Sequence, residues 1–148
     1  MNRIFIGIFL VAVLLSPAGN GYAQIRITAP KDGSTVSRET IVTGTASIPK
    51  GHHLWILARR NDFEPLWWPQ REAKIDDKTG EWRATVAFGG PQDIGWEFNI
   101  GVITVNNAGH TILMNYWKKA MKSGDWRLVE IPKVSSPPKI LKVTKMSH

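Results

Sequence analysis

The chain has 148 residues, 43% of them apolar and 21% charged, a composition typical of a globular protein and not of a disordered one. It carries 19 Lys and Arg against 12 Asp and Glu, so its net charge at pH 7 is +7. Cysteine is absent, which excludes a disulfide framework, a thiolate zinc site, an iron–sulfur cluster and a cysteine nucleophile.

The first residues have the pattern of a secretory signal. A positive end at Arg3 precedes an apolar run over residues 4–15, and small residues occur at Gly21 and Ala23. The run is too short to cross a bilayer, which takes about 20 apolar residues. We therefore expect a signal peptide over residues 1–23, cleavage after Ala23, and a single mature domain over 24–148 that is periplasmic or secreted.

Strand patterns dominate the mature chain. The clearest are apolar alternations or β-branched runs at residues 25–28, 40–46, 53–58, 81–88 and 98–105. Pro30 to Gly33 predicts a turn between the first two. Because Pro69 cannot donate a ladder hydrogen bond, residues 66–70 are expected to be an edge strand or the end of a strand. Runs spaced in this way indicate a sandwich or barrel.

One segment has helical and not strand periodicity. The apolar residues between Thr111 and Lys122 fall on one face of an α-helix, so we predict a helix over 111–122. Thr111 is the expected N-cap, and Gly124 suits the left-handed position beyond the last turn. Two further strands are expected at 126–131 and 140–144, with Trp126 sealing the first onto a sheet.

The motifs Pro30-x-x-Gly33-x-x-Val36, Val42-x-Gly44, Leu54-Trp55-Ile56, Trp67-Trp68-Pro69-Gln70, Gly80-x-Trp82 and Ile94-Gly95-x-x-Phe98-x-Ile100 carry a resemblance. Together they resemble the immunoglobulin-like or fibronectin-III-like β-sandwich modules of exported and surface bacterial proteins. The resemblance implies binding, adhesion or spacing, and it brings no common catalytic residue. The helix at 111–122 departs from a plain seven-strand sandwich and leaves the strand order after residue 105 open.

We therefore predict a mainly β protein, a single immunoglobulin-like antiparallel sandwich with one late inserted helix. Alternation assigns its core to Ile27, Val42, Trp55, Leu57, Trp82, Val86, Phe98, Ile100, Val102 and Val143.

The predicted binding site is an aromatic and basic edge. Neighbouring strand residues face opposite ways, so at most one of Trp67 and Trp68 enters the core and the other lies on the surface or under a loop. Together with polar and basic neighbours the pair gives the candidate site Trp67, Trp68, Gln70, Arg59, Arg60 and Arg71. The first hypothesis is a non-catalytic module that contacts a protein or cell-envelope partner through this edge. The alternative is a carbohydrate-binding module in which Trp67 or Trp68 stacks on a sugar ring.

Other chemistries find less support in the sequence. His52 and His53 are adjacent and face opposite ways on a strand, while His110 and His148 are distant in sequence, so no metal or other cofactor is expected. No triad spacing appears, and a small hydrolase is the third hypothesis. The basic charge attracts anionic envelope surfaces, whereas the export signal argues against nucleic acid.

Overall fold

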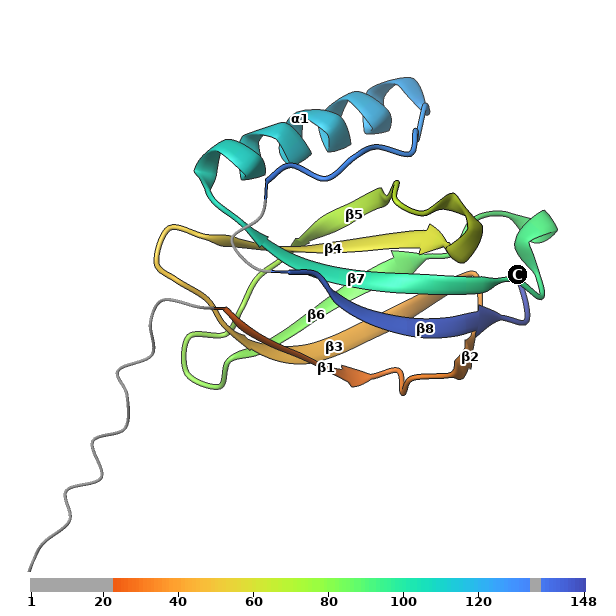
Figure 1. Ribbon diagram of the computed structural model, residues 1–148, viewed down its shortest axis with the longest axis horizontal. Coiled ribbons are helices and arrows are strands. Elements are labelled where there is room, and N and C mark those ends of the chain that lie inside the picture. The colour runs from red at the N-terminus through yellow and green to blue at the C-terminus, as the bar shows by residue number, and fades with distance from the viewer. Residues whose placement is uncertain (1–22, 134–136) are drawn as a thin grey trace, which may run out of the picture.

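The computed structural model describes residues 23–133 and 137–148, and Figure 1 shows two sheets with a helix lying above one of them. The expected signal segment, up to residue 22, lies outside the described residues. The strands are β1 (Gln24–Ala29), β2 (Ser34–Val36), β3 (Glu39–Ser47), β4 (His53–Arg60), β5 (Trp68–Ala73), β6 (Glu81–Ala87), β7 (Glu97–Val105) and β8 (Lys139–Lys145). The helices are α1 (Asn107–Ser123) and two 3-10 turns, η1 (Asn61–Phe63) and η2 (Pro91–Asp93). Within the described residues, none of these helices has the length and apolar character needed to cross a membrane.

The strands form a three-stranded sheet in the order β1-β3-β6 and a five-stranded sheet in the order β2-β8-β7-β4-β5. β1 pairs with β3 in the first sheet. β2, a short strand that was not predicted from the sequence, follows the predicted turn and pairs with β8 in the second sheet. The β2–β8 pair is parallel, which is a departure from the antiparallel pairing expected throughout. The predicted fold class, an immunoglobulin-like sandwich with one late helix, is confirmed by this arrangement.

The inner core lies between the two sheets. It contains the predicted core residues Val42, Trp82, Val86, Phe98, Ile100, Val102 and Val143. Ile27 is partly buried against the same core. Phe88 and Phe98 meet edge to face with ring centroids 5.4 Å apart. Each large apolar side chain that is removed from water here contributes about 1.5–3 kcal/mol to folding.

A second cluster, the outer core, lies between the five-stranded sheet and α1. Its buried members are Trp55, Leu57, Trp67, Ile103, Val105 and Leu113. The prediction that Trp55 and Leu57 share the interior of the sandwich is therefore wrong. Odd-numbered side chains of β4 point away from the other sheet, because successive strand residues alternate. As predicted, β4 is a central strand, pairing with β5 on one side and β7 on the other.

Helix α1 begins four residues earlier than the apolar periodicity indicated. Its N-cap is Asn106, whose side chain accepts a hydrogen bond from the Gly109 backbone N–H, so the assignment of Thr111 as N-cap is wrong. The first turn, Asn107 to Gly109, carries no large apolar side chain and gave no periodic signal. The C-terminal prediction is confirmed: Gly124 has φ of 73° and its N–H bonds to the carbonyl of Ala120.

The strand expected at 126–131 does not form. The segment makes one isolated bridge, in which Trp67 and Val129 exchange backbone hydrogen bonds of 2.9 Å. The rest of the segment follows the helix, because the Tyr116 hydroxyl donates to the carbonyl of Arg127 at 2.6 Å. Trp126 is 43% exposed and does not seal a strand onto the sheet.

The close approach of the Trp67 ring to Gly101 can be tested by adding a side chain at this glycine. A Cβ atom at Gly101 would lie 2.8 Å from the indole, so only a bare backbone lets this ring lie against β7. We expect Gly101→Ala to lower the free energy of unfolding by about 1–3 kcal/mol in urea denaturation. In a Trp67→Phe background the same change should cost less, because the smaller ring leaves room. An equal cost in both backgrounds would contradict this packing.

Candidate functional site

Arg59, one of the six predicted site residues, lies in the interior. It is 5% exposed, and its guanidinium stacks on Trp67 at 3.9 Å from the ring centroid. Its Nε donates to Asn99 Oδ1 at 3.0 Å, and Glu64 lies 3.9 Å from its Nη2. A guanidinium that is desolvated over an indole contributes about 2 kcal/mol or more to packing. Arg59 therefore stabilises the outer core.

Arg60 fixes one end of the sandwich. Its Nε and Nη2 donate to the Asp62 carboxylate at 2.6 and 2.8 Å, and its Nη1 donates to the buried Asp93 at 2.8 Å. The guanidinium also lies over the rings of Phe63 and Trp96. All three donor nitrogens are thus used within the protein, and Arg60 joins η1 to η2.

The tandem indoles point to opposite sides of the sheet. Trp67 is 3% exposed and belongs to the outer core, so its faces are not accessible to a ligand. Trp68 is partly buried against the inner core, and its Nε1–H donates to the carbonyl of Trp126 at 3.2 Å. Phe63 meets Trp68 edge on, with centroids 5.5 Å apart. Only Trp68 of the pair retains any exposed surface.

Gln70 and Arg71 follow on β5, which is an edge strand as Pro69 indicated. Gln70 Oε1 accepts from the Ala87 N–H at 2.9 Å, and its Nε2 donates to the carbonyl of Trp68 at 3.3 Å. This side chain therefore ties β5 to the end of β6. Arg71 is exposed, and within residues 23–133 and 137–148 it makes no hydrogen bond or ion pair.

A groove of about 470 Å³ brings together part of the predicted edge and residues that sequence reasoning placed elsewhere. We call it the indole groove. Its lining consists of Trp68, Pro69, Gln70, Arg71, Ala87, Gly89, Trp117, Met121 and Trp126. Three indoles and a methionine thus line the same groove as Arg71. The walls from α1 and from Trp126 were missed, because residues far along the chain meet β5 only after the helix folds over the sheet.

A second assembly, the histidine cluster, joins β4, β5 and the first turn of α1. His53 Nδ1 lies 3.0 Å from Glu72 Oε1, and His53 Nε2 lies 2.9 Å from Asn107 Oδ1. The rings of His53 and His110 stack with centroids 3.7 Å apart at 8°. The interpretation of His110 as a distant residue is therefore wrong. Val105 pairs with His53, and α1 begins two residues later, which places His110 above His53.

Hydrogen-bond partners assign the protons of the cluster. The Trp55 indole N–H can only donate, and it lies 3.0 Å from His110 Nδ1, so this nitrogen is an acceptor. Neutral His110 then carries its proton on Nε2, which faces Glu72 Oε2 at 3.7 Å. Both nitrogens of His53 face oxygens, an arrangement that suits the imidazolium. The two rings, each about a quarter exposed, thus hold different protonation states.

The pKa values of the two imidazoles move apart. Burial lowers the pKa of His53, but hydrogen bonds to Glu72 and Asn107 and the Glu72 charge outweigh it, so the pKa rises above 6.5. Burial lowers the pKa of His110, and the neighbouring His53 charge lowers it further against the opposing pull of Glu72. Between the two folded pKa values the pair therefore carries a single excess proton, on His53, and this positive charge balances the Glu72 carboxylate.

A metal ion fits this geometry poorly, although the cluster offers two imidazoles and a carboxylate with ligand atoms within 4.8 Å of one another. Imidazole binds metal in the plane of its ring, and two parallel planes 3.7 Å apart do not converge on one ion. The second nitrogen of a metal-bound histidine normally donates a hydrogen bond, whereas His110 Nδ1 accepts one from Trp55. The arrangement therefore suits ring nitrogens that carry protons and hydrogen bonds better than ring nitrogens that bind a metal ion.

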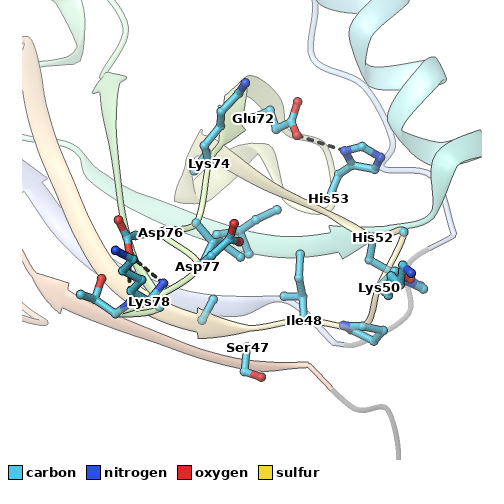
Figure 2. A pocket seen from close by; sticks show the side chains of 18 residues that line it. Ser47, Ile48, Lys50, His52, His53, Glu72, Lys74, Asp76, Asp77 and Lys78 are labelled. Atoms are coloured by element: carbon cyan, nitrogen blue, oxygen red, sulfur yellow. Dashed lines mark hydrogen bonds and ion pairs between the residues drawn. The ribbon is translucent and has the colours of Figure 1, made fainter.

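A polar hollow of about 680 Å³ lies beside the cluster, between the β3–β4 and β5–β6 loops. Figure 2 shows His53 bonded to Glu72 among the lining residues, with Lys74, Asp76, Asp77 and Lys78 on one side of the hollow and Lys50 on the other. Asp76 accepts hydrogen bonds from the backbone N–H groups of Lys78 and Thr79, which is a turn-stabilising role. Mixed charges with local partners do not single out a ligand here.

No protein-family model matches the chain, and no curated protein matches it significantly. Among solved structures, the chain is similar to murine CRIg, with 8% sequence identity over 86% of this chain and 99% of that one and a TM-score of 0.34. A similarity of this size carries no argument about function, and the fold assignment rests on the strand order described above.

The different placements of Arg59 and Arg71 predict different effects of the same substitution. Arg59→Gln should lower the free energy of unfolding by about 2–4 kcal/mol, since it removes a buried charge and its stacking on Trp67. Arg71→Gln should change stability by less than about 0.5 kcal/mol, because the side chain is exposed and unpaired. Urea denaturation of both variants measures this, and equal effects would refute the assignment of Arg59 to the outer core.

The geometry of the histidine cluster predicts that zinc does not change the thermal stability of the protein. At pH 7, about 100 µM Zn²⁺ should leave the thermal midpoint unchanged, because a bound ion would have to break the Trp55 hydrogen bond and unstack the rings. Differential scanning fluorimetry measures the midpoint. A zinc-dependent rise that disappears in His110→Asn would show that the rings rearrange around a metal.

Proposed function

We propose that the mature chain is an exported, non-catalytic binding module of the cell envelope and that the indole groove is its ligand site. The observation that carries the proposal is the groove itself, which is lined by three indoles, Met121 and the exposed Arg71. Aromatic residues, methionine and arginine are the side chains enriched at recognition surfaces. The predicted edge is retained in part: Trp68, Gln70 and Arg71 line the groove. Arg59 and Trp67 belong to the outer core instead, and Arg60 joins η1 to η2.

The groove suits a ligand that combines an aromatic or apolar body with an anionic group. The indoles bury an apolar body, and Arg71 offers charge-assisted hydrogen bonds to a carboxylate or a similar anion. The net charge of +7 adds long-range attraction for such a ligand. An acidic segment of a partner protein that carries an aromatic side chain meets both requirements.

Strand addition is a less suitable binding mode at this edge. Pro69 lacks an N–H group, and the Gln70 amide already occupies the carbonyl of Trp68 and the N–H of Ala87. An incoming strand would have to displace those bonds. The ligand is therefore expected to bind through its side chains.

A carbohydrate ligand is the second candidate, supported by one observation. Trp126 is 43% exposed, so a face of its indole is open to a sugar ring. Sugar hydroxyls also need several convergent hydrogen-bonding groups, and in this lining the Gln70 amide and the Trp68 N–H are already engaged. The acidic and aromatic ligand is therefore favoured.

The histidine cluster supports a non-catalytic role. Both nitrogens of His53 and the Nδ1 of His110 hydrogen-bond to protein groups, and His110 Nε2 faces Glu72. In this arrangement no imidazole nitrogen points at a substrate, as a general base must.

The groove predicts binding of a small aromatic anion. We expect 2-naphthalenesulfonate to bind with chemical-shift changes at the indole N–H groups of Trp68, Trp117 and Trp126 in ¹H–¹⁵N spectra. Arg71→Gln should weaken binding about tenfold or more, since a hydrogen bond to a charged group contributes about 1.5–3 kcal/mol. The matched control Arg83→Gln removes an exposed arginine of β6 outside the groove and should have no effect.

Three results decide between the ligand classes. If both arginine variants weaken binding equally, the effect is due to the net charge of the protein and the proposed site is refuted. Neutral 2-naphthol should bind more weakly than the sulfonate if Arg71 contributes as proposed. Binding of a chitin or peptidoglycan oligosaccharide that is lost in Trp126→Ala, with none of the sulfonate, would replace the proposal by the carbohydrate alternative.

A further inference from the structure

The histidine cluster is the one place where side chains of β4, β5 and the start of α1 all meet through polar contacts. His53 comes from β4, Glu72 from β5, and Asn107 and His110 from the first turn of the helix. The remaining contacts between α1 and the sheet that form the outer core are apolar. Titration can therefore weaken the attachment of α1 at this end without altering the apolar packing.

A second proton cannot be accommodated here by a simple rearrangement. Neutral His110 carries its proton on Nε2, so another proton must go to Nδ1, where the Trp55 indole N–H already points from 3.0 Å. Indole nitrogen cannot accept a hydrogen bond, so two donors would face each other. The His53 imidazolium also lies in van der Waals contact with the His110 ring, and two like charges would then be stacked.

The position of His110 in the helix adds to this effect. It lies in the first turns of α1, where the aligned peptide dipoles present partial positive charge. A positive side chain at this end is unfavourable. Glu72 is the carboxylate that acts on both imidazoles, and its single negative charge balances one imidazolium but not two.

The loss of the cluster proton at alkaline pH is easier to accommodate. Neutral His53 can keep its Nδ1–H bond to Glu72 and accept at Nε2, provided that the Asn107 amide rotates to present its NH₂ group. The cluster thus tolerates the loss of a proton better than the gain of one, because a second proton on His110 faces the Trp55 indole N–H, which cannot accept a hydrogen bond.

We propose that His53, Glu72, Asn107 and His110 form a proton-sensitive attachment that holds the first turns of α1 on the sheet near neutral pH and releases them in acid. The release extends to the ligand site, a step that rests on the proposed function, because Trp117 and Met121 on the same helix wall the indole groove. Ligand affinity should then fall as the pH drops.

The direction of each titration defines the pH window. The folded pKa of His110 lies below 6.5, so its contribution to stability is present above pH 6.5 and is lost as the pH falls towards the folded pKa. The folded pKa of His53 lies above 6.5, so its contribution is present below pH 6.5 and is lost as the pH rises through the folded pKa. The attachment is therefore strongest between the two folded pKa values, and release occurs below the lower one.

Hydrogen exchange on the full mature chain tests the attachment without any ligand. Between pH 7 and pH 5, protection factors of amides 110–114 should fall about tenfold, while those in β3 and β6 stay constant. His110→Asn should remove the pH dependence, because its amide oxygen still accepts from Trp55 but does not titrate. Glu72→Gln should move the release to higher pH, since it removes the balancing negative charge.

Two outcomes would overturn the proposal. One is a wild-type protection factor at 110–114 that does not change with pH. The other is the same change in wild type and His110→Asn. Imidazole ¹⁵N shifts at pH 7 must also show the Nε2–H tautomer of His110, and the Nδ1–H tautomer would refute the mechanism.

The extension to the groove has its own readout. The sulfonate of 2-naphthalenesulfonate stays charged across this range, so its affinity reports the protein alone. It should bind about threefold or more weakly at pH 5 than at pH 7 in wild type but not in His110→Asn, in line with a partial loss of α1 attachment. Equal pH dependence in both proteins would refute the link. If 2-naphthalenesulfonate binds at neither pH, only the proposed function of the groove is refuted, because hydrogen exchange tests the attachment of α1 separately.

Discussion

The rest of the structure depends on the burial of β4 and β7 on both faces. Their side chains supply the inner core on one side and Trp55, Leu57, Ile103 and Val105 on the other, so the five-stranded sheet has an apolar region on its outer face as well. Such a face must be removed from water, and α1 together with the following segment covers it (Figure 1). The helix is therefore a third layer of the protein, and the indole groove and the histidine cluster both lie at its contacts with the sheet.

The positions of the two sites are set by the contacts between α1 and the five-stranded sheet. At the C-terminal half of α1 the helix reaches the edge strand β5, and Trp117 and Met121 complete a groove that β5 alone does not form. At the N-terminal end the helix begins directly after β7, so its polar first turn lies over His53 and Glu72. One end of the contact is apolar and open to a ligand, and the other is polar and titratable. Rigid attachment of α1 makes the two interdependent.

Much of the fold was accessible from the sequence because alternation is a local property. Most of the strands, the turn at Pro30, the edge position of Pro69 and the left-handed Gly124 follow from residue types within a few positions of one another. The exceptions are β2, which was not predicted, and the strand predicted at 126–131, which does not form. The sequence does not show which face of the sheet each side chain of β4 occupies. Leu54 to Ala58 is apolar at every position, which indicates only that both faces of this strand are covered. Proximity in sequence was likewise a poor guide to the site: Arg59 and Arg71 are both basic and near the tandem indoles, yet Arg59 is buried against Trp67 and Arg71 is exposed.

The most direct test of this three-layer arrangement is the solvent accessibility of each indole N–H, measured by paramagnetic relaxation with a neutral gadolinium chelate in ¹H–¹⁵N spectra. If α1 covers the outer face, the signals of Trp55 and Trp67 will be as protected as that of Trp82 in the inner core, while those of Trp96 and Trp126 will broaden. If Trp55 and Trp67 broaden like Trp96, then the outer face is open, and the account of both sites fails with it.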